Sequence, residues 1–546
     1  MLIKNIPKNT NKFKKPAHDI FMENIEIKKN NKILKSALFL TIAGFVTKII
    51  GVLYKVPLLE IVGSEGLGYY QLVFPVFVFA LILSSGGITT TLSKIIAKCD
   101  SEKFKKLYFK ICLIESVLFA TIISIILFCF CDKIAYFQGG EGLCSSYKIL
   151  CLALLSSAII STFRGYFQGL NNMNFTAWSQ LIEQVGKIAL GLLFSFIFIK
   201  ESVIKSIYGA FLGLSISEII CALFLIVLYV LKSDKIHKFR FNFYEVKEGL
   251  KSFNKELLPI TITALITPLF GAINSLLVID LLLKAGVGKE CAILLFGLSG
   301  VILSLVGIPN IVSTALSTTI FPQICSKNKT QSEKNKIITF SFKLIFAVCI
   351  PCVFVFVIFS KPIVSFLYSE GLSYGNVNQL EIASHIIKIV STMVLYSSLS
   401  SFTTTLLQAQ NKSFKACQNL LFGSIITLIC FIVLVSNPLI NILGDSLSSL
   451  VGLSVTALLN LKELSKFNTY KLRFKDVFLS PILASLAMIF VMLIIFKGLS
   501  GALPLKLATL FVCFIGFVVY IMLMFMLKVF SVNDFSKLKP VKQQEN

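Results

Sequence analysis

Two lysines in the first apolar segment of the chain are placed to bind an anion. Lys48 and Lys55 are seven residues apart, which is two helical turns, so both project from one face of a helix. A charge in the middle of a bilayer costs about 2.5–3.5 kcal/mol on insertion scales. A charged residue inside a membrane span therefore suggests a function. We therefore predict that both amines line a cavity for an anionic ligand. The alternative is that Lys48 snorkels to the membrane surface or pairs with a carboxylate such as Glu115.

Polar side chains in two other apolar segments complete the predicted binding cavity. Gln180 and Gln184 lie one turn apart and are expected to contact a sugar or peptide group of the ligand. Glu115 and Glu183 are the acidic candidates. Glu183 also has a structural alternative, because Lys187 follows at i,i+4, the spacing of an ion pair within one helix.

Stretches that contain several glycines are predicted to be conformational joints. The run 160–174 places Arg164, Gly165 and Gly169 in a polar turn between two apolar segments. Gly86 and Gly87 lie inside another apolar segment, where paired glycines favour close helix contact or a partly unwound helix.

The remaining acidic and sulfur-containing residues predict no metal centre and no enzyme active site. Asn274 and Asp280 are the candidate ion site, although they form no ligand set that names an ion. The 14 Cys lie nearly all in apolar runs, where they are interpreted as small buried side chains, and the three His are dispersed. The sequence has no Walker A loop, GxSxG or HExxH motif. We expect a protein without enzymatic activity or cofactor, driven by an Na⁺ or H⁺ gradient or by the membrane potential.

The apolar composition predicts the fold class. Hydrophobic residues make up 56% and charged residues 14% of the 546 residues, against about 25% charged residues in soluble domains. Repeated uncharged runs of about 20 residues are typical of transmembrane helices. These runs do not alternate, which argues against a β-barrel. We predict an all-α polytopic membrane protein with about 14 transmembrane helices.

The distribution of basic residues predicts the orientation of the chain. Of the 52 Lys and Arg residues, 38 fall in segments that are cytoplasmic if the N-terminus is inside, and 9 fall in the outer loops. This bias follows the positive-inside rule, so we predict a protein of the bacterial cell membrane with both termini cytoplasmic. The same rule accounts for the net charge of +25 without a nucleic-acid partner. The basic and aromatic loop 232–256 is expected to lie on anionic lipid.

A short internal repeat divides the chain into two halves. Gln168 and Gln408 begin similar polar turns 240 residues apart, and six predicted spans separate the two copies. We therefore predict two parallel six-helix lobes and two added C-terminal helices. The expected parts are a basic cytoplasmic tail at 1–33, an N-lobe at 34–231, a cytoplasmic linker at 232–256, a C-lobe at 257–461, two further helices within 462–530 and a cytoplasmic tail at 531–546.

Four short motifs resemble those of one protein family. They are Arg-Gly-Tyr-Phe-Gln-Gly at 164–169, Ser-Ser-Gly-Gly-Ile at 84–88, Phe-Gly-Leu-Ser-Gly at 296–300 and Gly-Ile-Pro at 307–309. Together they resemble the stage V sporulation protein B family. That family belongs to the MOP flippase superfamily, together with the MurJ lipid II flippases, and the resemblance extends over about residues 35–530.

The resemblance implies a fourteen-helix transporter with two lobes around a central cationic cavity. It also implies a groove for a lipid tail at the last two helices, and an undecaprenyl-pyrophosphate-linked cargo moved by alternating access. Lys48 and Lys55 fall where the family has basic cavity residues, usually including Arg, whose bidentate fork Lys cannot reproduce. Asn274 stands where the resemblance implies Asp, and Phe175 stands where the family usually has Pro.

The leading functional hypothesis is a flippase for a lipid-linked peptidoglycan precursor, lipid II, with a use in sporulation. The alternatives are a flippase for teichoic or capsular units, a multidrug/cation antiporter of the same superfamily, a membrane-embedded glycosyltransferase or polymerase, and a non-transporting cell-wall scaffold. The expected partners are the lipid-linked oligosaccharide, membrane lipids and cell-wall synthesis proteins, and the expected oligomeric state is a monomer.

Overall fold

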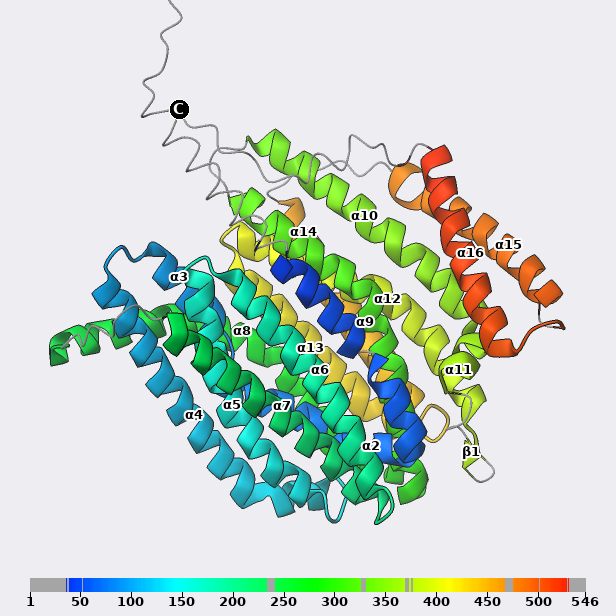
Figure 1. The fold of residues 1–546 in the computed structure, drawn as a ribbon. Coiled ribbons are helices and arrows are strands. Elements are labelled where there is room, and N and C mark those ends of the chain that lie inside the picture. The colour runs from blue at the N-terminus through cyan, green and yellow to red at the C-terminus, as the bar shows by residue number, and fades with distance from the viewer. Residues whose placement is uncertain are drawn as a thin grey trace, which may run out of the picture.

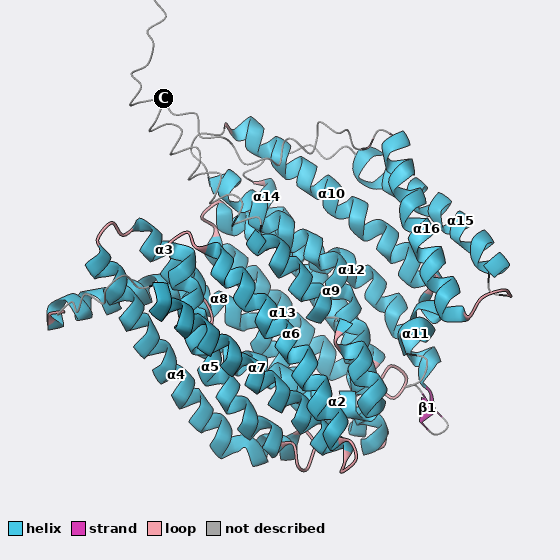
Figure 2. Ribbon diagram, viewed as in Figure 1, coloured by secondary structure: helices cyan, strands magenta, loops and turns pink. Residues whose placement is uncertain are grey.

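The computed structural model describes residues 36, 39–51, 53–232, 241–325, 330–368, 373–374, 377–466, 475–499, 501–527 and 529. Nearly all of this part of the chain is helical (Figure 2). A short antiparallel pairing of Ser373–Tyr374 (β1) with Val377–Asn378 (β2) is the one sheet within these ranges. The predicted all-α fold class is therefore confirmed.

The helices fall into two successive sets and a C-terminal pair. The first set is the helical run 39–51, α2 (Lys55–Ser85), α3 (Ile88–Lys98), α4 (Glu102–Phe137), α5 (Cys144–Gly169), α6 (Met173–Phe198) and α7 (Val203–Lys232). The second set is α8 (Phe243–Lys284), α9 (Lys289–Cys325), α10 (Gln331–Ile358), α11 (Ser360–Tyr368), α12 (Gln379–Ala409), α13 (Ser413–Val435) and α14 (Leu443–Ser465). The π-helical turn η1 (Lys475–Leu479) then leads into α15 (Ser480–Leu499) and α16 (Leu505–Met526).

The described helices are numerous enough for fourteen membrane crossings. Twelve helical stretches are long and apolar enough to cross a bilayer, and the bent pair Lys289–Leu305 with Pro309–Ser317 makes a thirteenth. One of the twelve, Phe39–Lys98, has 60 residues. A straight helix of that length would measure about 90 Å, roughly three times the hydrocarbon core. Gly63 divides this stretch, because its φ of 69° lies in the left-handed region, and counting the two halves separately gives the predicted fourteen.

The second span is interrupted at the predicted glycine pair. Helix α2 ends at Ser85, and Gly87 has a φ of 81° before α3 begins. The carbonyl oxygen of Gly86 accepts a hydrogen bond of 2.7 Å from Thr261 Oγ1 of α8. Of the two alternatives given for this pair, the structure shows the interrupted helix, and a helix of the second set stabilises the break. A role of the pair as a conformational joint stays a prediction.

The two polar turns of the internal repeat have the same backbone. Asn171, between α5 and α6, has a φ of 59°, and Asn411, between α12 and α13, has a φ of 60°. In the first turn the Asn171 N–H donates to the carbonyl of Gln168, and in the second the Asn411 N–H donates to the carbonyl of Gln408. Asn is one of the few residues that adopt this conformation readily. The two turns of the repeat therefore share one backbone conformation, and the duplication of the lobes stays a prediction.

The C-terminal pair α15–α16 lies at one edge of the bundle, beside α10 and α11 (Figure 1). Tyr520 of α16 donates a hydrogen bond of 2.7 Å to the carbonyl of Ala347 in α10. The rings of Phe346 and Phe478 lie 4.5 Å apart by their centroids. These contacts attach the C-terminal segment to α10 of the second set.

Candidate functional site

The first helix, defined here as the helical run 39–51 together with the start of α2 at Lys55, carries the residues of the candidate site on one stripe. Gly44, Lys48, Gly51 and Lys55 follow one another at spacings of four, three and four residues. This spacing puts all four on one side of a helix. The stripe therefore presents two amines separated by positions that have no side chain.

The two lysines connect the first helix to α9 of the second set. Lys48 Nζ donates a hydrogen bond of 3.2 Å to Thr314 Oγ1. Lys55 Nζ donates to the carbonyl oxygen of Gly300 at 3.0 Å and to Gln71 Oε1 at 3.2 Å. Both amines therefore lie at the contact between the two lobes.

Small residues bring α2 and α9 close together next to these lysines. A Cβ added at Gly297 would lie 2.4 Å from the backbone N of Gly68 and 2.5 Å from the carbonyl oxygen of Ser64. A Cβ added at Gly300 would lie 2.4 Å from Gln71 Cδ. Real Cβ atoms do not approach backbone atoms this closely, so the contact of α9 with α2 requires glycine at position 297.

The glutamines of α6 face the glycines of the same stripe. A Cβ added at Gly44 would lie 3.8 Å from Gln180 Oε1, and a Cβ added at Gly51 would lie 3.2 Å from Gln184 Nε2. Gln180 Oε1 is buried and has no hydrogen-bond partner among the described residues. The structure thus brings together four predicted site residues, since Gln180 and Gln184 lie beside the helix that carries Lys48 and Lys55.

A buried ionic network joins three helices of the first lobe. Arg164 of α5 donates from Nη2 to Glu183 Oε2 at 2.7 Å and from Nε to Ser179 Oγ at 2.8 Å. Lys187 Nζ lies 2.5 Å from Glu183 Oε1 and 2.7 Å from Glu218 Oε1 of α7. The i,i+4 pair of Glu183 with Lys187 is confirmed. The network contains two positive and two negative charges, and Glu218 is the member that the predicted site left out.

The lysine stripe of the first helix and the ionic network of α5, α6 and α7 therefore differ in their charge balance. Neither Lys48 nor Lys55 forms an ion pair with a described carboxylate, whereas the charges of the α5–α6–α7 network compensate one another. Each carboxylate oxygen of Glu183 already accepts a hydrogen bond from a basic group. Among the described residues, Lys48 and Lys55 therefore contribute positive charge at the lobe contact that no carboxylate pairs with.

The glycines of the predicted joint have a packing role. A Cβ added at Gly165 would lie 3.0 Å from the carbonyl oxygen of Thr89, and one added at Gly169 would lie 2.7 Å from Ile96 Cβ. Both neighbours belong to α3, so these glycines let α5 pack closely against it. A role of Arg164, Gly165 and Gly169 in conformational change stays a prediction.

The remaining predicted residues lie apart from the lysine stripe. Glu115 of α4 is beside Asn254 of α8, and its Oε2 is buried without a hydrogen-bond partner. Lys48 donates to Thr314, so the alternative pairing of Lys48 with Glu115 is not formed.

The two residues of the candidate ion site do not form one ligand set. Asp280 is exposed and pairs with Lys284 at 2.7 Å on the same helix. Asn274 is only partly exposed, and its Oδ1 is buried without a partner among the described residues. Asn274 and Asp280 are six residues apart on α8, and this separation puts their side chains on different faces of the helix. The structure therefore gives this pair no common position for an ion.

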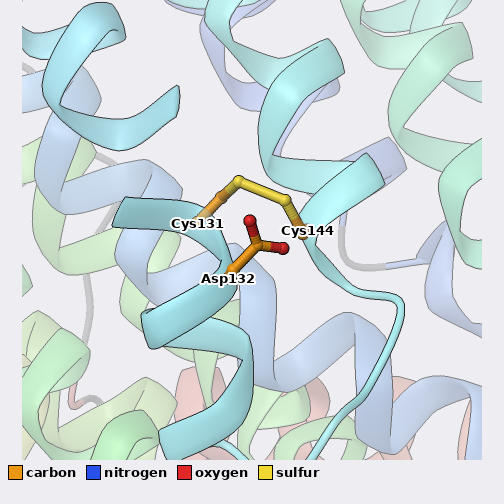
Figure 3. A group of neighbouring side chains, drawn as sticks. All are labelled: Cys131, Asp132 and Cys144. Carbon is orange, nitrogen blue, oxygen red and sulfur yellow. A yellow bond between two sulfur atoms is a disulfide. The ribbon is translucent and has the colours of Figure 1, made fainter. Parts of the chain in front are cut away.

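A disulfide joins Cys131 at the end of α4 to Cys144 at the start of α5 (Figure 3). The interpretation of the cysteines as small buried side chains is wrong for this pair. The signal in the sequence was their position on either side of one predicted outer loop, because disulfides persist on the oxidising side of a membrane. Asp132 lies next to the disulfide, and these three residues are the one described group of Cys, His, Asp and Glu with ligand atoms close enough to hold a metal ion.

The sequence comparisons agree with this architecture. A sequence profile of the polysaccharide biosynthesis protein family matches residues 33–327. Stage V sporulation protein B of Bacillus subtilis (strain 168) is 27% identical over 464 residues, which cover 82% of this chain and 86% of that protein. The lipid II flippase MurJ of the same organism is 24% identical over 434 residues, which cover 73% of this chain and 77% of that protein.

Solved structures share the fold. The inward closed conformation of the lipid II flippase MurJ has a TM-score of 0.64 at 18% identity and covers 90% of this chain and 98% of that one. An inward-facing multidrug resistance MATE family transporter of the MOP superfamily has a TM-score of 0.61 at 15% identity. The match covers 77% of this chain and 95% of the transporter chain. The protein therefore has the all-helical polytopic fold of these MOP-superfamily transporters. The chain belongs to the polysaccharide biosynthesis protein family.

Proposed function

We propose that this protein is a flippase that moves an undecaprenyl-pyrophosphate-linked cell-wall precursor from the inner to the outer leaflet, with lipid II as the cargo. The observation that carries the proposal is the position of Lys48 and Lys55, two amines at the contact between the lobes with no carboxylate partner among the described residues. An anionic pyrophosphate supplies the negative charge that this contact lacks. The names of two relatives, a sporulation protein and a lipid II flippase, support peptidoglycan synthesis during sporulation as the setting.

The same amines link cargo binding to the movement of the lobes. In the closed arrangement they donate to Thr314 and to the Gly300 carbonyl of the C-lobe. When the lobes separate at this contact, these bonds break and both amines become available for phosphate oxygens. Gln180 and Gln184 then contact the sugar or peptide, and the prenyl tail stays in the lipid along α15 and α16. Alternating access exposes the cargo first to one leaflet and then to the other.

The energy source that we propose is an Na⁺ or H⁺ gradient or the membrane potential, since the sequence has no nucleotide-binding loop. The protein lies in the bacterial cell membrane with both termini in the cytoplasm. It works as a monomer, and its partners are the lipid-linked cargo, membrane lipids and proteins of cell-wall synthesis.

Complementation tests the proposal directly. The full-length protein is expressed in a strain depleted of its lipid II flippase, and the purified protein is assayed with labelled lipid II in proteoliposomes. Rescue together with flipping in vitro is the expected result. Normal expression with neither rescue nor flipping would exclude lipid II as the cargo. Flipping of a lipid-linked teichoic or capsular unit in the same liposomes would then identify the other class of glycan.

A further inference from the structure

The disulfide between Cys131 and Cys144 encloses a loop that touches both lobes. Cys131 lies in the last turns of α4 and Cys144 is the first residue of α5, and their Cα atoms are 4.8 Å apart. Both sulfur-bearing residues are buried, with exposed fractions of 0% and 8%. The chain between them contains the turn 138–143, which is defined here as the bracketed loop.

One side chain of the bracketed loop bonds to both lobes. Gln138 is fully buried. Its Nε2 donates to the carbonyl of Leu72 in α2 at 2.8 Å and to Ser275 Oγ in α8 at 3.4 Å. Its Oε1 accepts a hydrogen bond of 2.7 Å from the Tyr147 hydroxyl of α5. The amide of Gln138 therefore ties two helices of the N-lobe to the first helix of the C-lobe.

The backbone of the bracketed loop also packs against the C-lobe. Gly139 has a φ of 67°. A Cβ at this position would lie 3.2 Å from Ile279 Cγ2 of α8 and 3.3 Å from Lys289 Cε of α9. The N–H of Gly140 donates to the carbonyl of Ala135 at 3.0 Å, which fixes the loop on the end of α4. If α4 and α5 move apart at this end, the bracketed loop therefore shifts and its contact with α8 and α9 of the C-lobe is disturbed.

We propose that the Cys131–Cys144 disulfide is a thiol–disulfide switch that holds the bracketed loop against α8 and α9, and that its reduction loosens this contact between the lobes. A covalent link across the hairpin restricts the conformations of the loop that presents Gln138 and Gly139. The proposal rests on the orientation given under the proposed function. With the N-terminus in the cytoplasm, the loop between α4 and α5 follows the third span and faces outward, where the surroundings are oxidising.

The chemistry of the switch is ordinary thiol–disulfide exchange with a dithiol. A thiolate of the dithiol attacks the sulfur of Cys144, the less buried of the two residues, the S–S bond breaks, and Cys131 leaves as a thiolate. The second thiol of the dithiol then resolves the mixed disulfide. Two electrons and two protons pass from the dithiol to the cysteines, and the dithiol becomes a disulfide. A disulfide-bearing oxidoreductase of the outer face reverses the reaction.

Hydrogen–deuterium exchange of the full-length protein in nanodiscs tests the switch without any cargo. Differential alkylation and mass spectrometry first establish the redox state of each cysteine. Addition of a dithiol is expected to raise amide exchange several-fold in peptides from 134–146 and from 272–292. The double variant C131S/C144S should show the raised exchange with and without dithiol. The variant C129S is the matched control, because Cys129 is an exposed free cysteine of the same helix, and it should respond as the wild type does.

Three results would overturn the proposal. The first is free Cys131 and Cys144 thiols in protein purified without reductant. The second is complete reduction that leaves exchange of both regions unchanged. The third is a zinc ion bound by disulfide-free Cys131, Cys144 and Asp132 in protein taken from cell membranes, which would make the group a metal site. Since none of these measurements uses lipid II, the switch and the proposed cargo can fail independently.

Discussion

Lys55 Nζ of the first helix donates a hydrogen bond to the carbonyl oxygen of Gly300 in α9, 3.0 Å away. The same amine donates to Gln71 Oε1, and the side chain of Gln71 lies against Gly300. One cationic group is thus held at once by its own lobe and by the other. A movement that separates the lobes at this position has to break the bond to Gly300, and it releases the amine for another acceptor.

Removal of both amines should abolish anion binding without unfolding the protein. A hydrogen bond to a charged group contributes about 1.5–3 kcal/mol, so K48Q/K55Q is expected to flip lipid II at least about tenfold more slowly. Initial rates in proteoliposomes measure the effect. K284Q is the control, because Lys284 is exposed and pairs with Asp280 on its own helix. Equal rates for K48Q/K55Q and the wild type would refute the cationic role.

Loss of Arg164 should destabilise the first lobe. The change R164M leaves Glu183 and Glu218 with Lys187 as the one remaining cation of the network. Breaking a buried ion pair from one side costs about 3–5 kcal/mol. A marked fall in Tm is expected in nanodiscs. The double variant R164M/E183Q removes one charge of each sign and should recover most of the loss. A Tm for R164M equal to that of the wild type would contradict the compensation seen in the network.

The left-handed backbone at Gly87 should resist substitution. G87A forces an L-residue to a φ of 81° and puts a Cβ 3.0 Å from Ile260 Cγ2. The left-handed conformation alone costs about 1–2 kcal/mol, so a lower Tm and altered flipping are expected. G288A is the control, since a Cβ there has no neighbour within 4 Å. If both variants unfold at the same temperature as the wild type, the break in the second span needs no glycine.

A side chain at Gly51 should obstruct the candidate site. Its Cβ would lie 3.2 Å from Gln184 Nε2, so G51V fills the space between the first helix and α6. We expect slower flipping with little change in Tm, because Gly51 is only partly buried. G44A should have a weaker effect, since its Cβ would keep an ordinary contact of 3.8 Å with Gln180 Oε1. Faster or unchanged flipping by G51V would exclude this space from the cargo path.

Properties that belong to a single segment could be predicted from the sequence. The apolar runs predicted the spans, and the i,i+4 spacing indicated the pair of Glu183 with Lys187. The glycine pair allowed either close helix contact or the break seen after Ser85. The similar turns at Gln168 and Gln408 have the same backbone, as their sequences indicate. Each of these depends on neighbours along the chain, and helical periodicity describes such neighbours well.

Contacts between distant segments could not be predicted in the same way. Glu218 completes the ionic network from another helix, and Ser299 of α9 donates to Asp445 of α14 at 2.7 Å across 146 residues. Periodicity shows which residues share a face, but it does not show which two faces meet. The role of Gln138 was missed for this reason, because its buried position depends on α2, α5 and α8 together.

The one-residue break at Gly63 limits how the first span can move. A longer loop between two spans would absorb a change in the tilt of either one. Here the helix that carries Lys48 and Lys55 continues into the second span through a single non-helical residue. A change in tilt between the two spans therefore has to be taken up at Gly63 itself. The next break in the helix is at Gly86 and Gly87, at the opposite end of α2.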